Sequence, residues 1–319
     1  EYGGMEIESP IMYDFEHPAL KNYLHRFPAR QYVIETPNKK TFLRFSACFG
    51  QFLMAKDMTL SYKQMPLRIY ELTRYSFRAE QRGELSGLRR LRSFTMPDCH
   101  ALCTDMDQAK AEMLVRFDLA LELMDEIGFA VPGDFEIGMR VTKDFWDKEK
   151  EHIMEMLRRW EKPILLEMWD HQFFYFNMKY ELNFVDASYK AAALTTDQID
   201  TENAKRFDIT HIDKEGNRQY PYILHLSPSG AVERIIYALL EKASMETKAG
   251  RVPFFPLWLS PTQVRLVPVS ADQLEYCMNL LSKFDGIRVD MDDTDDSLNK
   301  KIRKAEKEWV PYIAVVGIK

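Results

Sequence analysis

The segment with the most chemical potential runs from Tyr75 to Cys103 and reads YSFRAEQRGELSGLRRLRSFTMPDCHALC. In it, Arg78 and Glu80 stand two residues apart at the expected end of a strand, so their side chains would share a face. A guanidinium group binds phosphate, and a carboxylate accepts a hydrogen bond from an amino group such as that of adenine. An Arg-x-Glu pair alone is more often a cross-strand ion pair, so only the wider segment can decide between the two interpretations.

Cysteine and histidine offer a second chemistry. Cys48, His100 and His225 lie far apart in the sequence and match no metal-ligand spacing. A cysteine within the apolar stretch FSACFG, residues 45–50, is most often a small core residue. A histidine that ends an apolar run, as in YILH at residues 222–225, is most often a satisfied core or strand-edge residue. Spacing alone therefore predicts no metal site.

The elements that must position these residues are mixed up to about residue 247. Residues 135–141 and 180–184 alternate apolar and polar side chains, which predicts half-buried strands, and we expect them to pair antiparallel. Helical spacing of apolar side chains predicts helices at residues 107–127, 147–160 and 231–243. We expect residues 1–247 to adopt an α+β fold, with helices flanking an antiparallel sheet and the methionine-rich stripes serving as core packing.

The composition changes at residues 248–256, where glycine and proline predict a linker. Strands and helices then alternate, at residues 264–269, 272–284, 287–291, 297–306 and 312–316. This order predicts a smaller parallel α/β domain over residues 257–319. The chain stops as its last apolar strand finishes, so we expect this domain to be incomplete and the chain to be a fragment of a longer protein.

Charge and composition exclude several classes of protein. The net charge of −6 argues against indiscriminate nucleic-acid binding, and the basic runs at 89–92 and 300–304 are most simply solvated surface. No apolar run approaches the roughly 20 residues of a membrane span, and no signal peptide is recognisable. Four irregularly spaced cysteines favour a reducing compartment over a disulfide framework. We expect a cytoplasmic protein with no membrane partner.

Three motifs, at residues 9–12, 78–94 and 230–234, carry a resemblance to a known family. Arg78-Ala79-Glu80, the loop that follows and residues 90–94 resemble motif 2 of the class II aminoacyl-tRNA synthetases. Residues 94–100, FTMPDCH, narrow the resemblance to the threonyl enzymes, especially the archaeal ones. Residues 230–234, GAVER, resemble motif 3, and residues 9–12, SPIM, resemble motif 1. The resemblance implies a class II fold followed by an anticodon-binding domain.

The resemblance implies an ATP site built from five residues of this chain. Arg78 would bind the α-phosphate, Glu80 the adenine amino group and Arg90 the γ-phosphate end. Phe94 would stack on adenine, and Arg234 would close over the phosphates from the other side. Attack of an amino-acid carboxylate on the α-phosphorus builds negative charge, which arginines and the Mg²⁺ that accompanies ATP would stabilise. No general base is needed, because the attacking carboxylate is already ionised.

The resemblance also implies what spacing could not, one zinc ion held by Cys48, His100 and His225. Three protein ligands leave an open position, which is typical of a catalytic zinc. An open zinc position would bind the amino and hydroxyl groups of L-threonine. Valine offers no hydroxyl, whereas an apolar pocket would separate the two amino acids only about a hundredfold.

Three further residues match positions of the family's amino-acid pocket. Asp98 would accept a hydrogen bond from the bound threonine, Gln198 would complete the pocket, and Lys179 would lie near the reacting end. Serine carries the same zinc-binding groups, so such a site should admit it, and a separate editing domain is the expected remedy. No editing domain is recognisable in this sequence.

The resemblance further implies tRNA(Thr) as a partner and a homodimer formed through motif 1. Two alternatives stay open at this point. Another class II enzyme that uses the same anticodon-binding domain, such as a prolyl-tRNA synthetase, would share Arg78, Glu80 and Arg234 but would have no reason to keep the three metal ligands. A synthetase paralogue that serves only as a binding module would tend to lose the arginines of motifs 2 and 3.

Overall fold

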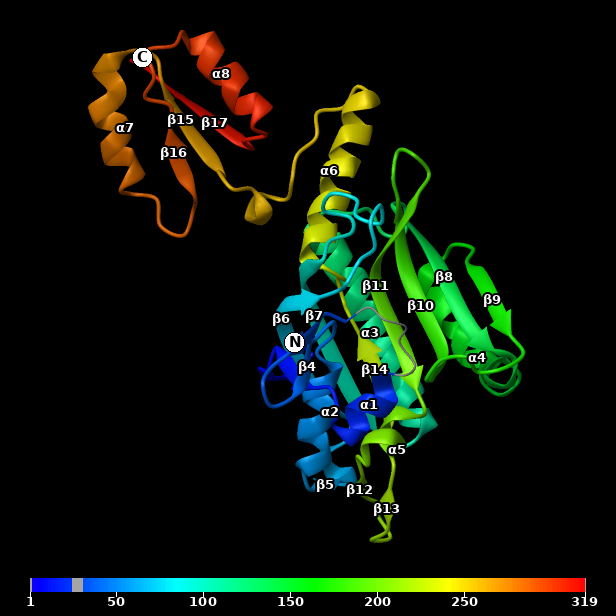
Figure 1. Cartoon of the computed structure of the whole chain (residues 1–319). Helices are drawn as coiled ribbons and strands as arrows, with labels where there is room; N and C mark the ends of the chain where they lie inside the picture. The colour runs from blue at the N-terminus through cyan, green and yellow to red at the C-terminus, as the bar shows by residue number, and fades with distance from the viewer. Residues whose placement is uncertain (1, 25–30, 319) are drawn as a thin grey trace. The chain divides into compact units, whose positions relative to one another are not determined.

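The computed structural model describes residues 2–24 and 31–318, and the chain divides into two compact units (Figure 1). Unit 1 comprises Glu1–Asp125 and Phe129–Leu240, and unit 2 comprises Glu126–Gly128 and Glu241–Lys319. Among the described residues, no helix is both long and apolar enough to cross a membrane.

An eight-stranded sheet forms the centre of unit 1, in the order β1-β6-β7-β14-β11-β10-β8-β9. Its strands are β1 (Met5–Glu6), β6 (Leu67–Phe77), β7 (Ser93–Cys103), β8 (Phe135–Thr142), β9 (Leu165–Trp169), β10 (Phe176–Val185), β11 (Ala191–Asp200) and β14 (Tyr222–Leu226). Neighbours from β6 to β8 pair antiparallel, whereas β1 and β9 pair parallel with β6 and β8. The α+β fold is confirmed, and the sheet is mixed because a parallel strand lies at either edge.

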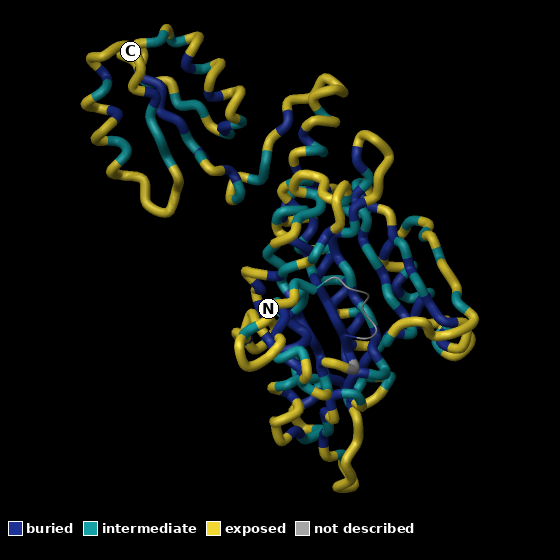
Figure 2. Tube along the Cα trace, viewed as in Figure 1, coloured by how far each residue is buried: buried dark blue, intermediate teal, exposed yellow. Residues whose placement is uncertain are grey.

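Helices α3 (Met106–Ile127) and α4 (Lys143–Trp160) belong to the helical layer behind this sheet (Figure 1). Phe117 of α3 is fully buried, and its ring meets that of Tyr180 on β10 edge to face at 5.2 Å. Helix α4 begins at Lys143, four residues before the predicted start at 147, because Thr142 caps it by accepting a hydrogen bond from the N–H of Phe145. Figure 2 shows that the central strands are the most deeply buried part of the unit.

Smaller elements cover the other face of the sheet. They include α1 (Pro18–Leu24), α2 (Cys48–Asp57), α5 (Asn203–Phe207), η1 (Tyr62–Gln64), a sheet of β2 (Met12–Asp14), β4 (Lys40–Leu43) and β3 (Val33–Glu35), and a sheet of β13 (Arg218–Gln219), β12 (His211–Ile212) and β5 (Leu60–Ser61). Their aromatic side chains form one core, in which the ring centroids of Phe52 and Phe207 lie 5.2 Å apart and those of Phe42 and Phe49 lie 5.3 Å apart. This core fixes the start of α2 against the face of β7 and β14.

The hairpin between β6 and β7 corrects the expectation for Arg78 and Glu80. Strand β6 ends at Phe77, so Arg78 and Glu80 follow the strand instead of sharing a face of it. Strand β7 begins at Ser93, three residues after Arg90, which therefore lies in the loop. The loop closes where the N–H of Arg78 donates to the carbonyl of Arg92 at 2.8 Å.

Unit 2 contains the parallel sheet that the alternation of elements predicted, in the order β16-β15-β17. Its elements are η2 (Leu257–Leu259), β15 (Val264–Pro268), η3 (Ala271–Gln273), α7 (Leu274–Leu281), β16 (Val289–Met291), α8 (Leu298–Lys307) and β17 (Tyr312–Val316). Helix α6 (Val232–Lys248) extends five residues beyond the predicted end at 243 and runs from unit 1 into unit 2. The predicted linker therefore begins at the last residue of this helix.

Candidate functional site

Strand pairing brings together two histidines that are distant in the sequence. His100 of β7 and His225 of β14 are direct register partners, and their rings lie 4.7 Å apart. Cys48 reaches them from the first residue of α2, which packs on this face. The three side chains are buried, and their ligand atoms all lie within 4.8 Å of one another. Pairing register, which no spacing rule encodes, therefore builds a cluster that could hold a metal ion.

Each histidine of this cluster is oriented by a partner behind it. Nδ1 of His100 lies 2.6 Å from Oε1 of Gln51, and Nε2 of His225 lies 2.7 Å from Oδ2 of Asp200. The opposite ring nitrogens therefore face Cys48 and each other. Sγ of Cys48 lies 3.2 Å from Nε2 of His100 and 3.7 Å from Nδ1 of His225, and these two nitrogens lie 3.1 Å apart. Carboxylate and amide partners of this kind fix the tautomer of metal-binding histidines.

Burial sets the ionisation of the cluster. It lowers the pKa of His100 well below its ordinary value, which keeps the ring neutral and its nitrogen available as a ligand. It raises the pKa of the Cys48 thiol, with Asp98 acting in the same direction. A bound cation would reverse that second effect, because metal coordination deprotonates a thiol.

Sequence reasoning missed the residues that orient the cluster. Gln51 follows Cys48 by three residues on α2, so a helical projection would have placed the two on one face. Phe52, one residue further, meets the rings of His100 and His225 at 5.1 and 5.5 Å. No comparable signal singled out Tyr175, whose ring lies 5.2 Å from that of His225.

The three residues assigned to the amino-acid pocket lie on three strands of the sheet, Asp98 on β7 and the other two on β11 and β10, with β14 between β7 and β11. Asp98 precedes His100 by two residues on β7 and is buried, and its Oδ2 accepts from the N–H of Ala47 at 2.9 Å. Burial raises the pKa of Asp98 to about 6, while the Ala47 amide and His225 lower it. Lys179 and Gln198 are direct partners on β10 and β11, and Lys179 pairs with Glu181 at 2.6 Å. Oε1 of Gln198 is a buried acceptor with no partner among the described residues.

The arginines assigned to ATP converge between the motif 2 loop and the start of α6. Arg234 donates to the carbonyls of Arg89 at 3.0 Å and Ala193 at 2.7 Å. Burial lowers the pKa of Arg234, and the charges of Arg78, Arg89 and Arg90 lower it further. A cluster of mutually repelling guanidinium groups is suited to a polyanion.

Glu80 meets two of these arginines in the structure. Its carboxylate lies 2.8 Å from Nη2 of Arg90 and 3.5 Å from Nε of Arg78. The ion pair that was the simplest interpretation of Arg-x-Glu is therefore present, although it forms within the loop and not across two strands.

A second link joins motif 2 to motif 3. Both carboxylate oxygens of Glu233 accept from the N–H of Thr95 at 3.0 Å. Phe94, the predicted adenine platform, precedes Thr95 and is half-buried opposite Ser76 of β6. The strand that carries Phe94 is thus fixed to the helix that carries Arg234, a contact that sequence reasoning did not foresee.

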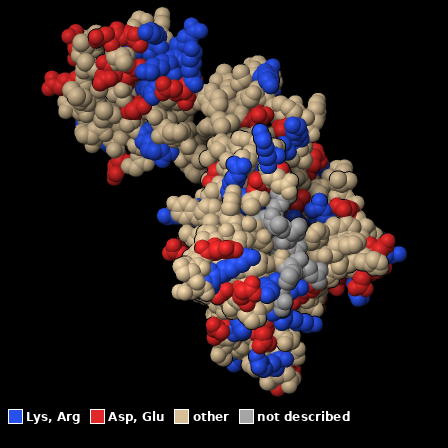
Figure 3. Space-filling model, in the orientation of Figure 1, with Lys and Arg blue, Asp and Glu red and all other residues tan. Residues whose placement is uncertain are grey.

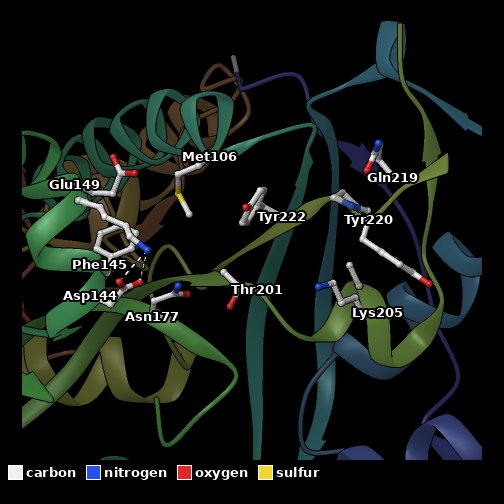
Figure 4. A pocket seen from close by; sticks show the side chains of 13 residues that line it. Met106, Asp144, Phe145, Glu149, Asn177, Thr201, Lys205, Gln219, Tyr220 and Tyr222 are labelled. Carbon is white, nitrogen blue, oxygen red and sulfur yellow. Dashed lines mark hydrogen bonds and ion pairs between the residues drawn. The ribbon is translucent and has the colours of Figure 1, made fainter. Parts of the chain in front are cut away.

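A separate polar cavity of about 510 Å³ opens elsewhere in unit 1 (Figure 4). Its lining includes Asp144 and Glu149 of α4, Lys205 of α5, Asn177 of β10 and Tyr222 of β14. Asp144 pairs there with Lys148, as the dashed lines in Figure 4 mark. None of the residues predicted for ATP, threonine or metal lines this cavity.

Two known protein families match this chain, one over most of unit 1 and one over most of unit 2. Residues 32–243 match the family described as tRNA synthetase class II core domain (G, H, P, S and T), and residues 263–319 match the anticodon binding domain family. The chain belongs to the class II aminoacyl-tRNA synthetases.

Curated relatives narrow the likeness within this class. The chain is 58% identical over 321 residues to a threonine–tRNA ligase of Pyrococcus furiosus and 60% identical over 319 residues to that of Thermococcus gammatolerans. These alignments cover 100% and 99% of the chain but 51% of each relative, so the chain spans about half the length of these proteins.

Solved structures share the fold at low sequence identity. A structure described as the RNA binding domain of threonyl-tRNA synthetase from Cryptosporidium parvum superposes with a TM-score of 0.79 at 24% identity, covering 98% of this chain and 77% of that one. A prolyl-tRNA synthetase of Giardia lamblia in complex with prolyl-adenylate gives 0.71 at 18% identity, covering 98% and 60%. Similarity at this level establishes the fold and leaves the amino acid open.

Proposed function

We propose that this chain activates L-threonine with ATP to form threonyl-adenylate, and that the longer protein to which it corresponds transfers the threonyl group to tRNA(Thr). The observation that carries the proposal is the convergence of Cys48, His100 and His225 on one point of a class II core, next to Asp98. A class II core alone does not specify an amino acid. Three residues that could hold a metal ion beside Asp98 support threonine, whose amino and hydroxyl groups can both bind a metal.

Zinc is the metal that these residues fit. Tetrahedral coordination with Zn–S near 2.3 Å and Zn–N near 2.0–2.1 Å places neighbouring ligand atoms roughly 3.3–3.6 Å apart. The three separations here, 3.1 to 3.7 Å, lie close to that range. One sulfur and two imidazole nitrogens also form a typical zinc donor set. When bound, zinc would act as a Lewis acid toward the amino and hydroxyl groups of threonine.

The surrounding side chains would complete the recognition of threonine. Asp98 is a buried acceptor within hydrogen-bonding distance of the Ala47 amide and next to His100, where a bound hydroxyl or amino group would donate to it. The unpartnered Oε1 of Gln198 supports the same assignment, because a buried acceptor without a donor is costly unless a ligand supplies one. Valine has no hydroxyl group, so it would leave unsatisfied the metal and the acceptor that bind the hydroxyl of threonine.

The arginines would carry the phosphate chemistry. Arg78 and Arg234 would hold the α-phosphate region from opposite sides, and Arg90 would bind the far phosphates after exchanging its contact with Glu80. Glu80 would then accept from the adenine amino group, with Phe94 stacked on the ring. Lys179 lies opposite Gln198 and would approach the reacting carboxylate. Mg²⁺ would enter with ATP and share the charge that develops on the phosphoryl oxygens.

Unit 2 would contact the anticodon region of tRNA(Thr). Basic side chains gather over α8 (Figure 3), and Lys300, Arg303 and Lys304 are exposed there. Lys301 is buried, and its Nζ donates to the carbonyl of Asp292 at 3.2 Å, so this lysine would support the helix instead of binding a phosphate.

A homodimer formed through motif 1 completes the proposal. Ser9 of this motif is buried. Its hydroxyl donates a hydrogen bond to Glu71 of β6 and accepts one from Arg44, and these bonds anchor the segment to β6. Met12 of the same motif and Leu72 of β6 are each 49% exposed, a degree of exposure that suits large apolar side chains at an interface. Sedimentation of the purified chain measures its mass, and a monomer at all concentrations contradicts this part of the proposal.

The two alternative functions predict different outcomes in one experiment. The chain is purified and its zinc content is measured, and exchange of labelled pyrophosphate into ATP is then followed with threonine or proline. We expect one zinc per chain and exchange that depends on threonine. Exchange with proline in a metal-free protein supports a prolyl enzyme. A folded, zinc-loaded chain that exchanges with neither amino acid supports a non-catalytic paralogue.

A further inference from the structure

A fully buried ion pair lies behind the sheet, beneath the proposed threonine pocket. Arg116 of α3 and Asp197 of β11 are both 0% exposed, and they meet in two contacts, Nε–Oδ2 at 2.9 Å and Nη2–Oδ1 at 3.0 Å. Successive residues of a strand point to opposite faces, so Asp197 faces α3 whereas Gln198 faces away from it. Apolar residues often replace a buried ion pair without loss of stability, so stability alone gives no reason for this one.

The pairing of β11 with β14 opens at the level of Gln198. Thr196 exchanges two backbone hydrogen bonds, of 3.1 and 2.9 Å, with Ser227, the residue that follows β14, and the ladder between β11 and β14 begins only at Ile199. In the same register Gln198 lies opposite His225, but no ladder pair joins them in the described part of the chain. The N–H of Gln198 donates to Oδ1 of Asp197 at 2.9 Å instead. The carboxylate that Arg116 holds therefore takes the place of a sheet hydrogen bond beneath the pocket.

The same guanidinium reaches a second strand. Nη2 of Arg116 donates to the carbonyl of Cys99 at 3.0 Å, at the residue between Asp98 and His100 on β7. Nη1 lies 3.3 Å from the hydroxyl of Tyr2, so all three nitrogens of the guanidinium have partners. Strand β14 lies between β7 and β11 in the sheet. One side chain thus ties together, across β14, the two strands that present Asp98, His100 and Gln198.

We propose that Arg116 is a positioning residue for the amino-acid pocket, fixing the separation between Asp98 on β7 and Gln198 on β11. This inference rests on the proposed function, because it takes these two residues to contact threonine. The planar fork of an arginine donates to the carboxylate and to the carbonyl in one fixed geometry. A lysine would keep the charge, but its ammonium on a flexible stem would not hold the two strands at a fixed separation, so the pocket would lose its spacing while the fold survives.

The test compares two variants with the wild-type chain in pyrophosphate exchange. Arg116→Lys keeps the charge, and Arg116→Met with Asp197→Leu removes both charges together, which avoids an unpaired buried ion. In both variants we expect the KM for threonine to rise roughly tenfold to a hundredfold, the effect of a misplaced contact group. The KM for ATP and the zinc content should stay at wild-type values, because neither the arginine cluster nor the metal ligands are touched.

The matched control is Glu112→Gln. Glu112 also joins α3 to the sheet, through an ion pair of 2.7 Å with Arg68 of β6. It reaches the guanidinium of Arg116 only indirectly, through the hydroxyl of Tyr2, and among the described residues none of its hydrogen bonds goes to β11. We expect this variant to unfold at lower urea concentration with an unchanged KM for threonine. A normal KM for threonine in folded Arg116 variants, or an equal rise in the Glu112 control, overturns the positioning role. A wild-type chain that shows no threonine-dependent exchange overturns the proposed function itself, before any variant is compared.

Discussion

Gln51 fixes the tautomer of His100, and its replacement by methionine is expected to weaken zinc binding. Oε1 of Gln51 lies 2.6 Å from Nδ1 of His100, and neither side chain is more than 1% exposed. Methionine has a similar length but offers only a weak sulfur acceptor, so the N–H at Nδ1 would lose its partner in a place that water does not reach. An unsatisfied buried donor costs about 1–3 kcal/mol, which corresponds to roughly 5- to 150-fold in affinity. Loss of an orienting partner typically weakens metal binding by about 10- to 100-fold.

Competition with a chromophoric chelator at neutral pH measures this effect. We expect the zinc dissociation constant of Gln51→Met to rise roughly 10- to 100-fold above that of the wild-type chain. Gln51→Glu is the matched control, because it keeps an oxygen acceptor at the same place and should retain tight binding. The second contact of Gln51, from Nε2 to the carbonyl of Asp98, spans 3.5 Å and adds little. An unchanged dissociation constant in Gln51→Met would refute the assignment of Gln51 as the partner that holds the ring.

Three further changes test other parts of the account. Cys48→Ser should lose zinc and threonine-dependent exchange while ATP binding, followed by calorimetry, persists; normal activation of threonine contradicts the ligand assignment. Arg234→Lys should raise the KM for ATP in pyrophosphate exchange by about tenfold, because a point charge replaces a fork, and an unchanged KM excludes Arg234 from the ATP site. Burial lowers the pKa of His152 from 6.5 to about 4, so its contribution to stability is present above pH 6.5 and is lost as the pH falls toward 4. Between pH 7 and pH 5 the wild-type chain should therefore lose about 2 kcal/mol more of its free energy of unfolding than His152→Leu, measured by urea titration. Equal losses in the two proteins contradict the buried neutral histidine.

The elements that sequence reasoning placed well are those whose periodicity is long and uninterrupted. Helix α3 spans Met106–Ile127 against a predicted 107–127, and β17 spans the predicted 312–316. The start of α4 was missed because it depends on a single capping hydroxyl, that of Thr142. The parallel direction of the edge strands β1 and β9 could not be predicted. Alternation of apolar and polar side chains shows which face of a strand is buried, but it does not show which strand is its neighbour or in which direction that neighbour runs.

The candidate site depended on a different kind of information. His100 and His225 meet because β7 pairs with β14 in one register, and a single sequence does not encode that register in any local pattern. Resemblance to a family pointed to the ligands. A helical projection could have placed Gln51 beside Cys48, whereas Asp200 became visible as a partner of His225 only in three dimensions. The contacts of Arg116 with β7 and β11 could not be predicted either. An arginine within an amphipathic helix is usually interpreted as solvent-exposed, and only the structure shows that this one is buried.

The discrimination between threonine and valine in pyrophosphate exchange tests the central claim most directly. If the open position on the metal selects the amino acid, the ratio of kcat/KM values for threonine and valine should exceed about a thousandfold, well above the roughly hundredfold limit of an apolar pocket. Removal of zinc from the same preparation should abolish exchange with threonine, and restoration of zinc should recover it. A ratio at or below about a hundredfold, or full threonine activity in the zinc-free chain, would contradict the account.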